Sequence, residues 1–424
     1  MKLTELNLNP VAKIRESTNF TVREVKKVCK NIGPRPSASE NEDRAQEYII
    51  ENCGKFADEV KKEPFTTAPR AFLSWPWVCA ILMMVSTGLY IGAFFAQSAL
   101  PEPALLAMRA VGLALNILCI FFIVFEFLLY KQVLDVFFKK RPSSNVVLTR
   151  KPKGEVKRRI VFAGHVDSSY EWRYTRLGGA KLLTTVIVWA IICIAVSLVA
   201  DILTLAVDLP EPIQLALVIA QGVCFVGVSV GYFFEDGKHP VDGANDNLTG
   251  VFASISVLQF LSFNNIELEN TEVVAVSMGC EEAGLRGSKA FAKAHDYNDV
   301  ETVCIAVDTL RDFAYMGVFN KDMSGTVKHD KQAVALLQKA SQLAELDLPL
   351  KSVLFGSSDA AALTQGGMKA VLLAAMDPAP ARYYHTRLDT ADNMDIRTVE
   401  KGVETLIHAT LLFDEQGLRD SYEA

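Results

Sequence analysis

The sequence predicts an α/β protein in which two pairs of membrane-spanning helices interrupt a domain built on a central, mostly parallel sheet with helices on both faces. Two observations favour this fold class. Half of the 424 residues are hydrophobic although 22% are charged, a mixture that is typical of membrane spans joined to a globular part. Outside the longest apolar runs, segments with strand and helix periodicity alternate along the chain, as they do in α/β domains.

Four apolar runs are long enough to cross a bilayer, which takes about 20 helical residues. Short connections at Glu102 and at 208–211 make each pair of runs an antiparallel helical hairpin. The second run contains two charged residues, Arg109 and Glu126, and we expect both to lie near helix ends with their charged groups reaching the membrane interface. The four runs are Ala71–Pro101, Pro103–Tyr130, Leu182–Ala200 and Pro212–Phe234.

Basic residues are concentrated on one side of these runs. Only Arg109 lies near the hairpin tips, whereas eleven lysines and arginines flank the other ends. Because basic flanks usually face the cytoplasm, we expect an integral membrane protein with four spans, with the globular domain and both termini cytoplasmic. The eleven residues are Lys61, Lys62, Arg70, Lys131, Lys139, Lys140, Arg141, Arg173, Arg176, Lys181 and Lys238.

The composition argues against several other classes of protein. A net charge of −6 provides no basic surface for nucleic acid. The eight cysteines are scattered and include no CxxC pair, so we expect neither a disulfide framework nor a thiolate zinc site. The first ten residues, MKLTELNLNP, have no apolar core before a cleavage site, so we expect no signal peptide.

The hairpins divide the rest of the chain into the pieces of one domain. We expect that domain to comprise residues 1–70, 131–180 and 235–424, with the hairpins at 71–130 and 181–234. The predicted strands are Asn145–Thr149, Arg159–Ala163, Thr271–Met278, Thr302–Val307, Lys351–Phe355 and Ala370–Ala374. The predicted helices are Glu42–Cys53, Gly250–Leu261, Ser288–Ala294, Ala333–Leu343, a helix near Ala360, and Thr398–Phe413.

Polar side chains follow two of the predicted strands, where open α/β sheets place their sites. In the segment His165-Val-Asp167, the carboxylate can accept one ring N–H of the histidine and so fix the tautomer of a metal ligand. Cys280-Glu281-Glu282 places two carboxylates side by side. One of them can bind a metal while its neighbour takes a proton from the water that the metal activates.

Three more residues complete this pattern. Asp246 lies in a loop before a helix and can bridge two cations, Asp308 directly follows a strand, and His385 lies in the loop before the last helix. Each of them alone is more often an ordinary cap or surface residue. Together with His165 and Glu282 they supply nitrogen and oxygen ligands for two borderline cations.

This order of residues resembles the co-catalytic zinc aminopeptidases of metallopeptidase family twenty-eight, which also contains glutamate carboxypeptidases and glutaminyl cyclases. The resemblance covers roughly residues 33–70 and 140–415, and Gly33-Pro-Arg-Pro36-Ser-Ala is similar to the family's N-terminal signature. It implies a mixed sheet sandwiched by helices, and two zinc ions. His165 and Asp308 would bind one zinc ion, Glu282 and His385 the other, and Asp246 both.

The resemblance also implies roles for four residues around the ligands. Glu281 would be the general base and later the general acid. Asp167 would orient the ring of His165 without binding zinc itself. Asp359, in Ser357-Ser358-Asp359, and Asp389 are weaker candidates for supporting the ligands. The chain departs from soluble members in the 81 positions between His165 and Asp246 (246 − 165), most of which the second hairpin accounts for.

The expected function is that of a membrane-anchored, zinc-dependent exopeptidase, with aminopeptidase activity as the first choice. The alternatives are a carboxypeptidase or dipeptidase of the same fold, a glutaminyl cyclase, and a non-catalytic membrane receptor. A four-helix permease is disfavoured because the spans hold almost no paired charge. The expected partners are a peptide substrate and the lipid bilayer, with no nucleic acid, and the hairpins offer a surface for homo-oligomers.

Overall fold

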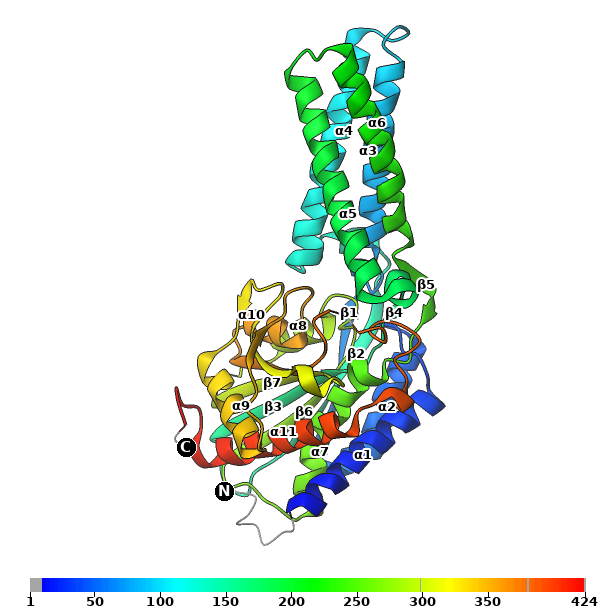
Figure 1. Cartoon of the computed structure of the whole chain (residues 1–424). Helices are drawn as coiled ribbons and strands as arrows, with labels where there is room; N and C mark the ends of the chain where they lie inside the picture. The colour runs from blue at the N-terminus through cyan, green and yellow to red at the C-terminus, as the bar shows by residue number, and fades with distance from the viewer. Residues whose placement is uncertain (1–9, 298, 380, 423–424) are drawn as a thin grey trace. The chain divides into compact units, whose positions relative to one another are not determined.

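The computed structural model describes residues 10–297, 299–379 and 381–422 (Figure 1). The first residues, for which we expect no signal peptide, lie outside this range. The chain divides into two compact units. The α/β unit contains the residues up to Pro69, Lys139–Glu171 and the residues from Lys238 onward, and the helical unit contains Arg70–Phe138 and Trp172–Gly237.

The α/β unit is built on a nine-stranded mixed sheet in the order β1-β2-β6-β3-β7-β11-β8-β10, with β9 paired to β8. The central strands β6, β3, β7 and β11 are parallel, and antiparallel pairs flank them on both sides. The predicted fold class is confirmed. The strands are β1 (Glu59–Thr67), β2 (Arg141–Arg150), β3 (Arg158–His165), β6 (Thr271–Met278), β7 (Glu301–Leu310), β8 (Met316–Asp322), β9 (Val327–Lys328), β10 (Leu350–Ser352) and β11 (Ala370–Ala375), and β4 (Tyr170–Trp172) pairs separately with β5 (Glu235–Pro240).

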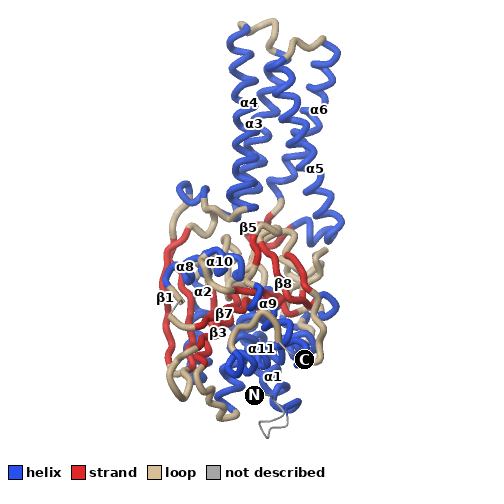
Figure 2. Tube along the Cα trace, turned by 90° about the vertical axis from the view of Figure 1, so that its left-hand side faces the viewer, coloured by secondary structure: helices blue, strands red, loops and turns tan. Residues whose placement is uncertain are grey.

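Helices cover both faces of this sheet (Figure 2). Ile160 and Phe162 of β3 belong to the larger core, with the helices α1, α2, α7, α9 and α11, whereas Val161 and Ala163 pack on the other face with α8 and α10. A strand buried on both faces is uniformly apolar, as parallel strands are. The helices of this unit are α1 (Pro10–Asn31), α2 (Glu40–Cys53), α7 (Thr249–Phe263), α8 (Arg286–Ala294), α9 (Lys331–Leu343), α10 (Asp359–Gln365) and α11 (Ile396–Gln416).

Polar side chains cap several of these helices. The hydroxyl of Ser39 accepts a hydrogen bond from the amide of Glu42 at the start of α2, and the carboxylate of Asp330 accepts the amides of Gln332 and Ala333 at the start of α9. These side chains satisfy amides that have no partner within the helix.

Several elements differ from the sequence-based prediction. Helix α1 and the strands β1, β4, β5, β8 and β9 were not expected, and the strand expected at Lys351–Phe355 ends at Ser352. Helix α1 joins the core through a sparse apolar stripe that includes Phe20, and the hydroxyl of Ser17 donates to Oε1 of Gln259 at 2.6 Å. The sequence-based prediction missed this stripe because most residues of α1 are charged or polar.

The helical unit contains four helices that are long and apolar enough to cross a membrane. Helix α3 packs against α4 and α6, and α5 packs against α4 and α6. The spans lie at Phe72–Phe95, Glu102–Leu128, Arg173–Ala206 and Glu211–Phe233, and they contain the helices α3 (Trp75–Phe95), α4 (Glu102–Phe122), α5 (Arg173–Ala206) and α6 (Glu211–Ser229).

Buried polar groups join these helices to one another. Nδ2 of Asn116 on α4 donates to Oδ2 of Asp201 on α5 at 2.5 Å, and the hydroxyl of Ser197 donates to Oε1 of Gln221 at 2.8 Å. Glu126 lies near the end of its span, as expected, but its carboxylate does not reach out to solvent. Its side chain is fully buried, because the chain turns back after α4 and the amide of Leu134 donates to Oε2 of Glu126 at 3.0 Å.

Phe20 provides a test of how α1 is held. Its ring contacts those of Phe56 and Phe252 edge-on, with centroids 5.4 and 6.4 Å away. We predict that Phe20→Ala lowers the free energy of unfolding by about 3–5 kcal/mol, because it leaves a cavity in a packed core. Denaturant unfolding of the purified protein measures this. Val11→Ala on the same helix is the control, since Val11 is 63% exposed, and equal effects of the two changes would contradict the packing described here.

Candidate metal centre

The predicted ligands lie at the carboxyl ends of the central strands of the α/β unit. His165 is the last residue of β3, and Asp308 lies near the end of the neighbouring strand β7. Glu282 follows β6, Asp246 lies in the turn before α7, and His385 lies in the loop before α11. The carboxyl ends of the three parallel strands β3, β6 and β7 therefore lie together at one edge of the sheet. Two loops bring Asp246 and His385 to the same edge.

The five side chains form two groups that share one member. His165, Asp246 and Asp308 each offer a ligand atom, and these atoms lie within 4.8 Å of one another. Asp246, Glu282 and His385 do the same. Oδ1 of Asp246 lies 3.2 Å from Nε2 of His165, whereas Oδ2 lies 3.0 Å from Nε2 of His385. The two oxygens of Asp246 thus face different histidines, as a carboxylate that bridges two cations would.

The donor atoms fit metal ions better than they fit one another. Asp246, Glu282 and His385 are all buried. Oδ2 of Asp246 and Oε1 of Glu282 have no well-directed hydrogen bond among the described residues, although Nε2 of His385 lies 3.0 and 3.2 Å from them. A buried carboxylate oxygen without a partner is costly. Imidazole nitrogens and carboxylate oxygens are ligands that zinc accepts in tetrahedral and related sites.

Electrostatics lead to the same conclusion. Burial raises the pKa of Asp308 to about 7, and the charge of Asp246 adds to this effect. Burial likewise raises the pKa of Glu282. Burial alone would lower the pKa of His385, but the carboxylates of Glu282 and Asp246 raise it to about 10. The centre therefore favours extra positive charge, which either protons or cations can supply.

Glu281 lies beside the ligands without belonging to either group. Its Oε2 is 3.8 Å from Nε2 of His165. Burial raises the pKa of its carboxyl well above the ordinary value, and the imidazole of His165 opposes this shift. A buried carboxylate next to metal ligands can accept and return a proton during a reaction.

The loop that carries Glu281 and Glu282 is held by side chains from distant elements. The amides of both residues donate to Oδ1 and Oδ2 of Asp167, at 3.0 and 3.1 Å. The amide of Cys280 donates to Oε1 of Glu42 at 2.7 Å, and that of Gly279 donates to Oδ1 of Asn145 at 3.0 Å. Four consecutive amides are thus fixed. Neither Glu42 nor Asn145 was recognised from the sequence, because they act on a loop more than 130 positions away.

Asp167 lies close to His165, but its carboxylate is not the nearest acceptor for the ring, as the sequence suggests it should be. Nδ1 of His165 is 3.2 Å from the backbone carbonyl oxygen of Asp167 and 3.5 Å from its Oδ1. The carbonyl is therefore the nearer group, while the carboxylate binds the amides of the glutamate loop. Tyr384 also contacts the ligands, since its ring stacks on that of His385 with centroids 3.9 Å apart.

Asp389 and Asp359 are both buried near the candidate ligands. Oδ2 of Asp389 accepts the amide of Asp246 at 3.1 Å, and Oδ1 accepts the amide of Asn245 at 2.9 Å, so Asp389 fixes the backbone of the shared ligand. Asp359 is the first residue of α10 and is buried. Burial raises the pKa of Asp359 to about 6, and its charge in turn contributes to the raised pKa of Glu281.

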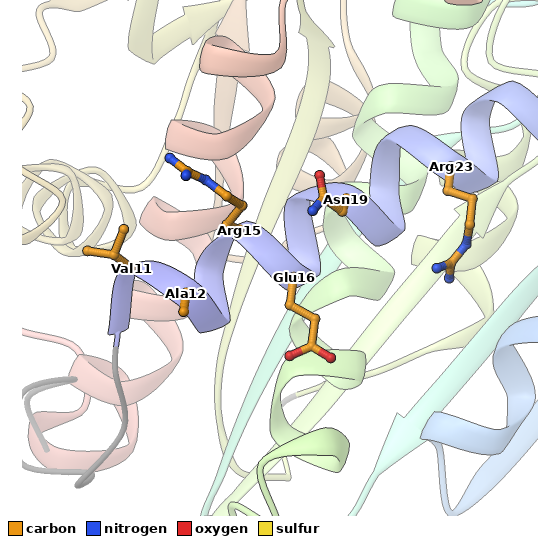
Figure 3. A pocket seen from close by; sticks show the side chains of 6 residues that line it. All are labelled: Val11, Ala12, Arg15, Glu16, Asn19 and Arg23. Atoms are coloured by element: carbon orange, nitrogen blue, oxygen red, sulfur yellow. The ribbon is translucent and has the colours of Figure 1, made fainter.

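A hollow on α1 lies apart from this centre. Figure 3 shows its lining side chains along the helix, and none of them is a candidate site residue. We assign it no role. The lining residues are Val11, Ala12, Arg15, Glu16, Asn19 and Arg23.

Known proteins resemble this chain in sequence and in fold. Residues 229–410 match the model of peptidase family M28, while a comparison with curated protein sequences gives no significant match. A Zn-dependent exopeptidase from Parabacteroides distasonis is 12% identical, with a TM-score of 0.52, and the match covers 93% of this chain and 96% of that one. An aminopeptidase from Aneurinibacillus is 14% identical, with a TM-score of 0.52 and coverages of 94% and 95%.

A glutaminyl cyclase from Bacteroides thetaiotaomicron has the same fold, with 12% identity, a TM-score of 0.53 and coverages of 92% and 96%. At these identities the structural matches show the fold alone. The matched segment contains four of the five candidate ligands, Asp246, Glu282, Asp308 and His385, together with Glu281. The sequence match, the fold and the predicted order of motifs agree, and residues 229–410 are identified as a segment of peptidase family M28.

Proposed function

We propose that the protein is a membrane-anchored, zinc-dependent exopeptidase, with aminopeptidase activity as the first choice. The observation that carries this proposal is the pair of buried ligand groups that share Asp246 and lie beside Glu281. Two cations and one free carboxylate are the components that metal-assisted hydrolysis of an amide requires.

The ligand assignment follows from the two groups. His165, Asp246 and Asp308 would hold one zinc ion, and Asp246, Glu282 and His385 the other. When bound, the ions would polarise the carbonyl of the substrate and make a nearby water more acidic. This assignment leaves Glu281 uncoordinated and able to exchange protons.

Glu281 would act twice in the reaction. As general base it takes a proton from the attacking water, whose oxygen forms a bond to the carbonyl carbon. As general acid it returns that proton to the nitrogen of the leaving amine as the C–N bond breaks, so its own charge is restored. Asp167 would keep the carboxyl in place through the amides of Glu281 and Glu282.

Glu281→Gln tests this assignment. We predict that the variant keeps its zinc and loses about 10²–10⁴-fold in kcat, because a carboxamide cannot accept the proton. Turnover assays measure the loss, and metal analysis by mass spectrometry measures the zinc. The matched control is Asp246→Asn, which we expect to lower the occupancy of both zinc ions. Wild-type kcat in the glutamine variant would reject Glu281 as the base, and full occupancy in Asp246→Asn would reject the bridge.

The class of substrate needs a second experiment, because structural neighbours include glutaminyl cyclases as well as aminopeptidases. We predict that a peptide with a free N-terminus is shortened from that end, that its N-acetylated twin is not cleaved, and that a chelator stops the reaction. Mass spectrometry of the products decides this. Loss of C-terminal residues from both peptides would indicate a carboxypeptidase, and loss of ammonia from an N-terminal glutamine peptide would indicate a cyclase.

The four apolar helices support the proposal that the protein crosses a membrane. We further propose that the hairpin tips lie outside, that the α/β unit and both termini are cytoplasmic, and that the hairpins provide a contact between copies. The basic residues near the non-tip ends of the helices favour this orientation. The proposed partners are therefore the bilayer, a peptide substrate and a second copy of the chain.

Cysteine labelling tests the orientation. We predict that Glu102→Cys and Asp208→Cys, at the two tips, react with a membrane-impermeant maleimide on intact cells, because both tips face outward. The parent protein sets the background, since seven of its eight cysteines are buried. The control is Lys153→Cys in the α/β unit, which we expect to react only after lysis. Labelling of the control alone on intact cells would reverse the orientation.

A further inference from the structure

We propose that Arg35 is a positioning residue for the metal centre, because it joins the two ligand-bearing loops that the second hairpin separates in the sequence. The first ligand loop is His165–Ser169, and the second ligand loop is Val241–Asp246. This inference rests on the proposed function, since it assumes that His165 and Asp246 bind metal. It gives a physical role to the Gly33-Pro-Arg-Pro36 motif, which the ligand set leaves unexplained.

The guanidinium of Arg35 is fully buried, and its three nitrogens donate to three backbone carbonyls. Nε donates to the oxygen of Val166 at 2.7 Å, and Nη2 donates to the oxygen of Gly243 at 3.1 Å. Nη1 donates to the oxygen of Gly33 at 2.8 Å. Val166 directly follows His165, and Gly243 lies three positions before Asp246. One planar group thus fixes the backbone beside His165 and the backbone that leads to Asp246.

Backbone and hydroxyl groups continue this link. The amide of Arg35 donates to Oγ of Ser168 at 2.9 Å, and the amide of Ser168 donates to the carbonyl of Arg35 at 3.0 Å. The hydroxyl of Ser168 in turn donates to the carbonyl of Val241 at 2.8 Å, and the amide of Val241 donates to the carbonyl of Ser169 at 3.0 Å. Arg35 and the two ligand loops therefore form one connected network.

The geometry requires an arginine. The rigid fork of a guanidinium can serve carbonyls in several directions at once, whereas a lysine ammonium is a single point at the end of a flexible chain. The positive charge also matters, because the carboxylates of Asp242, Asp167 and Asp389 all interact with it. Asp167 and Asp389 are the residues that hold the amides of Glu281, Glu282 and Asp246. Arg35 thus offsets the negative charge of the groups that support the ligands.

The competing explanation is that Arg35 only stabilises the fold. A second buried arginine, away from the ligand loops, provides a control that distinguishes this explanation from a positioning role. Arg159 is 8% exposed and lies at the opposite end of β3 from His165. Its guanidinium bonds to Glu272 and Asp299 at 2.6 and 2.7 Å, far along the strand from the ligands. Arg159→Met therefore removes a buried arginine without touching either ligand loop.

The experiment compares Arg35→Met, Arg35→Lys and Arg159→Met in the full-length protein in detergent. Apparent zinc affinity is measured by competition with a chromogenic chelator, stability by thermal unfolding of the metal-free protein, and kcat and KM by turnover. We expect Arg35→Met to lose at least tenfold in zinc affinity, as changes behind metal ligands do, and to lose kcat more than KM. Arg35→Lys should recover only part of this loss. Arg159→Met should lower the Tm while its zinc affinity stays within about twofold of wild type.

Three results would overturn the proposal: wild-type zinc affinity in Arg35→Met, wild-type affinity in Arg35→Lys, or equal losses in Arg35→Met and Arg159→Met. If Arg35→Met does not fold, Ser168→Ala removes the hydroxyl link alone. It should weaken zinc binding by a smaller factor, and unchanged binding would count against the network. A wild-type protein that binds no zinc and cleaves no peptide would instead reject the proposed function, so the two failures are distinguishable.

Discussion

Negative charge withdrawn from water is the constraint on which the α/β unit depends. Asp246, Glu281, Glu282 and Asp308 lie together at the ends of the central strands, and burial disfavours the ionised form of most of them. Such a group of carboxyls persists only if protons or cations neutralise it. The two histidines alone supply at most two positive charges. The arrangement of these carboxyls therefore favours the binding of cations. The loops around them must be rigid enough to hold like charges close together.

That rigidity comes from hydrogen bonds to backbone amides rather than from secondary structure. Asp167, Asp389 and Glu42 each accept amides from loops that carry ligands or the proposed base. These supporting side chains are themselves acidic, so they increase the charge that the centre must neutralise. The buried guanidinium of Arg35 is a fixed cation within the same network, and metal ions would complete the compensation. Metal binding at these ligands would therefore be coupled to the local folding of the loops.

Much of the fold was readable from the sequence, because the central strands are uniformly apolar and their polar residues come directly after them. His165, Glu282 and Asp308 were predicted as ligands in this way, and each belongs to one of the two groups that share Asp246. Helix α1 and strand β1 were missed for the opposite reason, because both are rich in polar residues. The apolar stripe of α1 is sparse. Strand β1 has the sequence EVKKEPFTT, and its pairing with β2 cannot be recognised from that sequence alone. Glu42 and Arg35 act on backbone groups far away in the chain, and no local pattern reports such contacts.

In the helical unit, hydropathy identified the four apolar helices but not the polar contacts between them. Asn116 and Asp201 lie on different hairpins and are hydrogen-bonded to each other, so the hairpins are linked by a contact that an apolar run conceals. Such interhelical bonds contribute about 0.6–2 kcal/mol each. The burial of Glu126 was missed because its partner, the amide of Leu134, belongs to the segment that follows the helix rather than to the helix itself.

The hydrogen bond between Ser169 and Val241 has a consequence for how this architecture can arise. It brings together the two points where the polypeptide leaves and re-enters the α/β unit around the second hairpin. For the α/β unit, everything between these two points is equivalent to a loop, and the entropy cost of closing a loop grows only slowly with its length. A single splice at that position can therefore add or remove the second hairpin while the candidate ligands stay in register, so proteins with one hairpin and proteins with two can share one α/β scaffold.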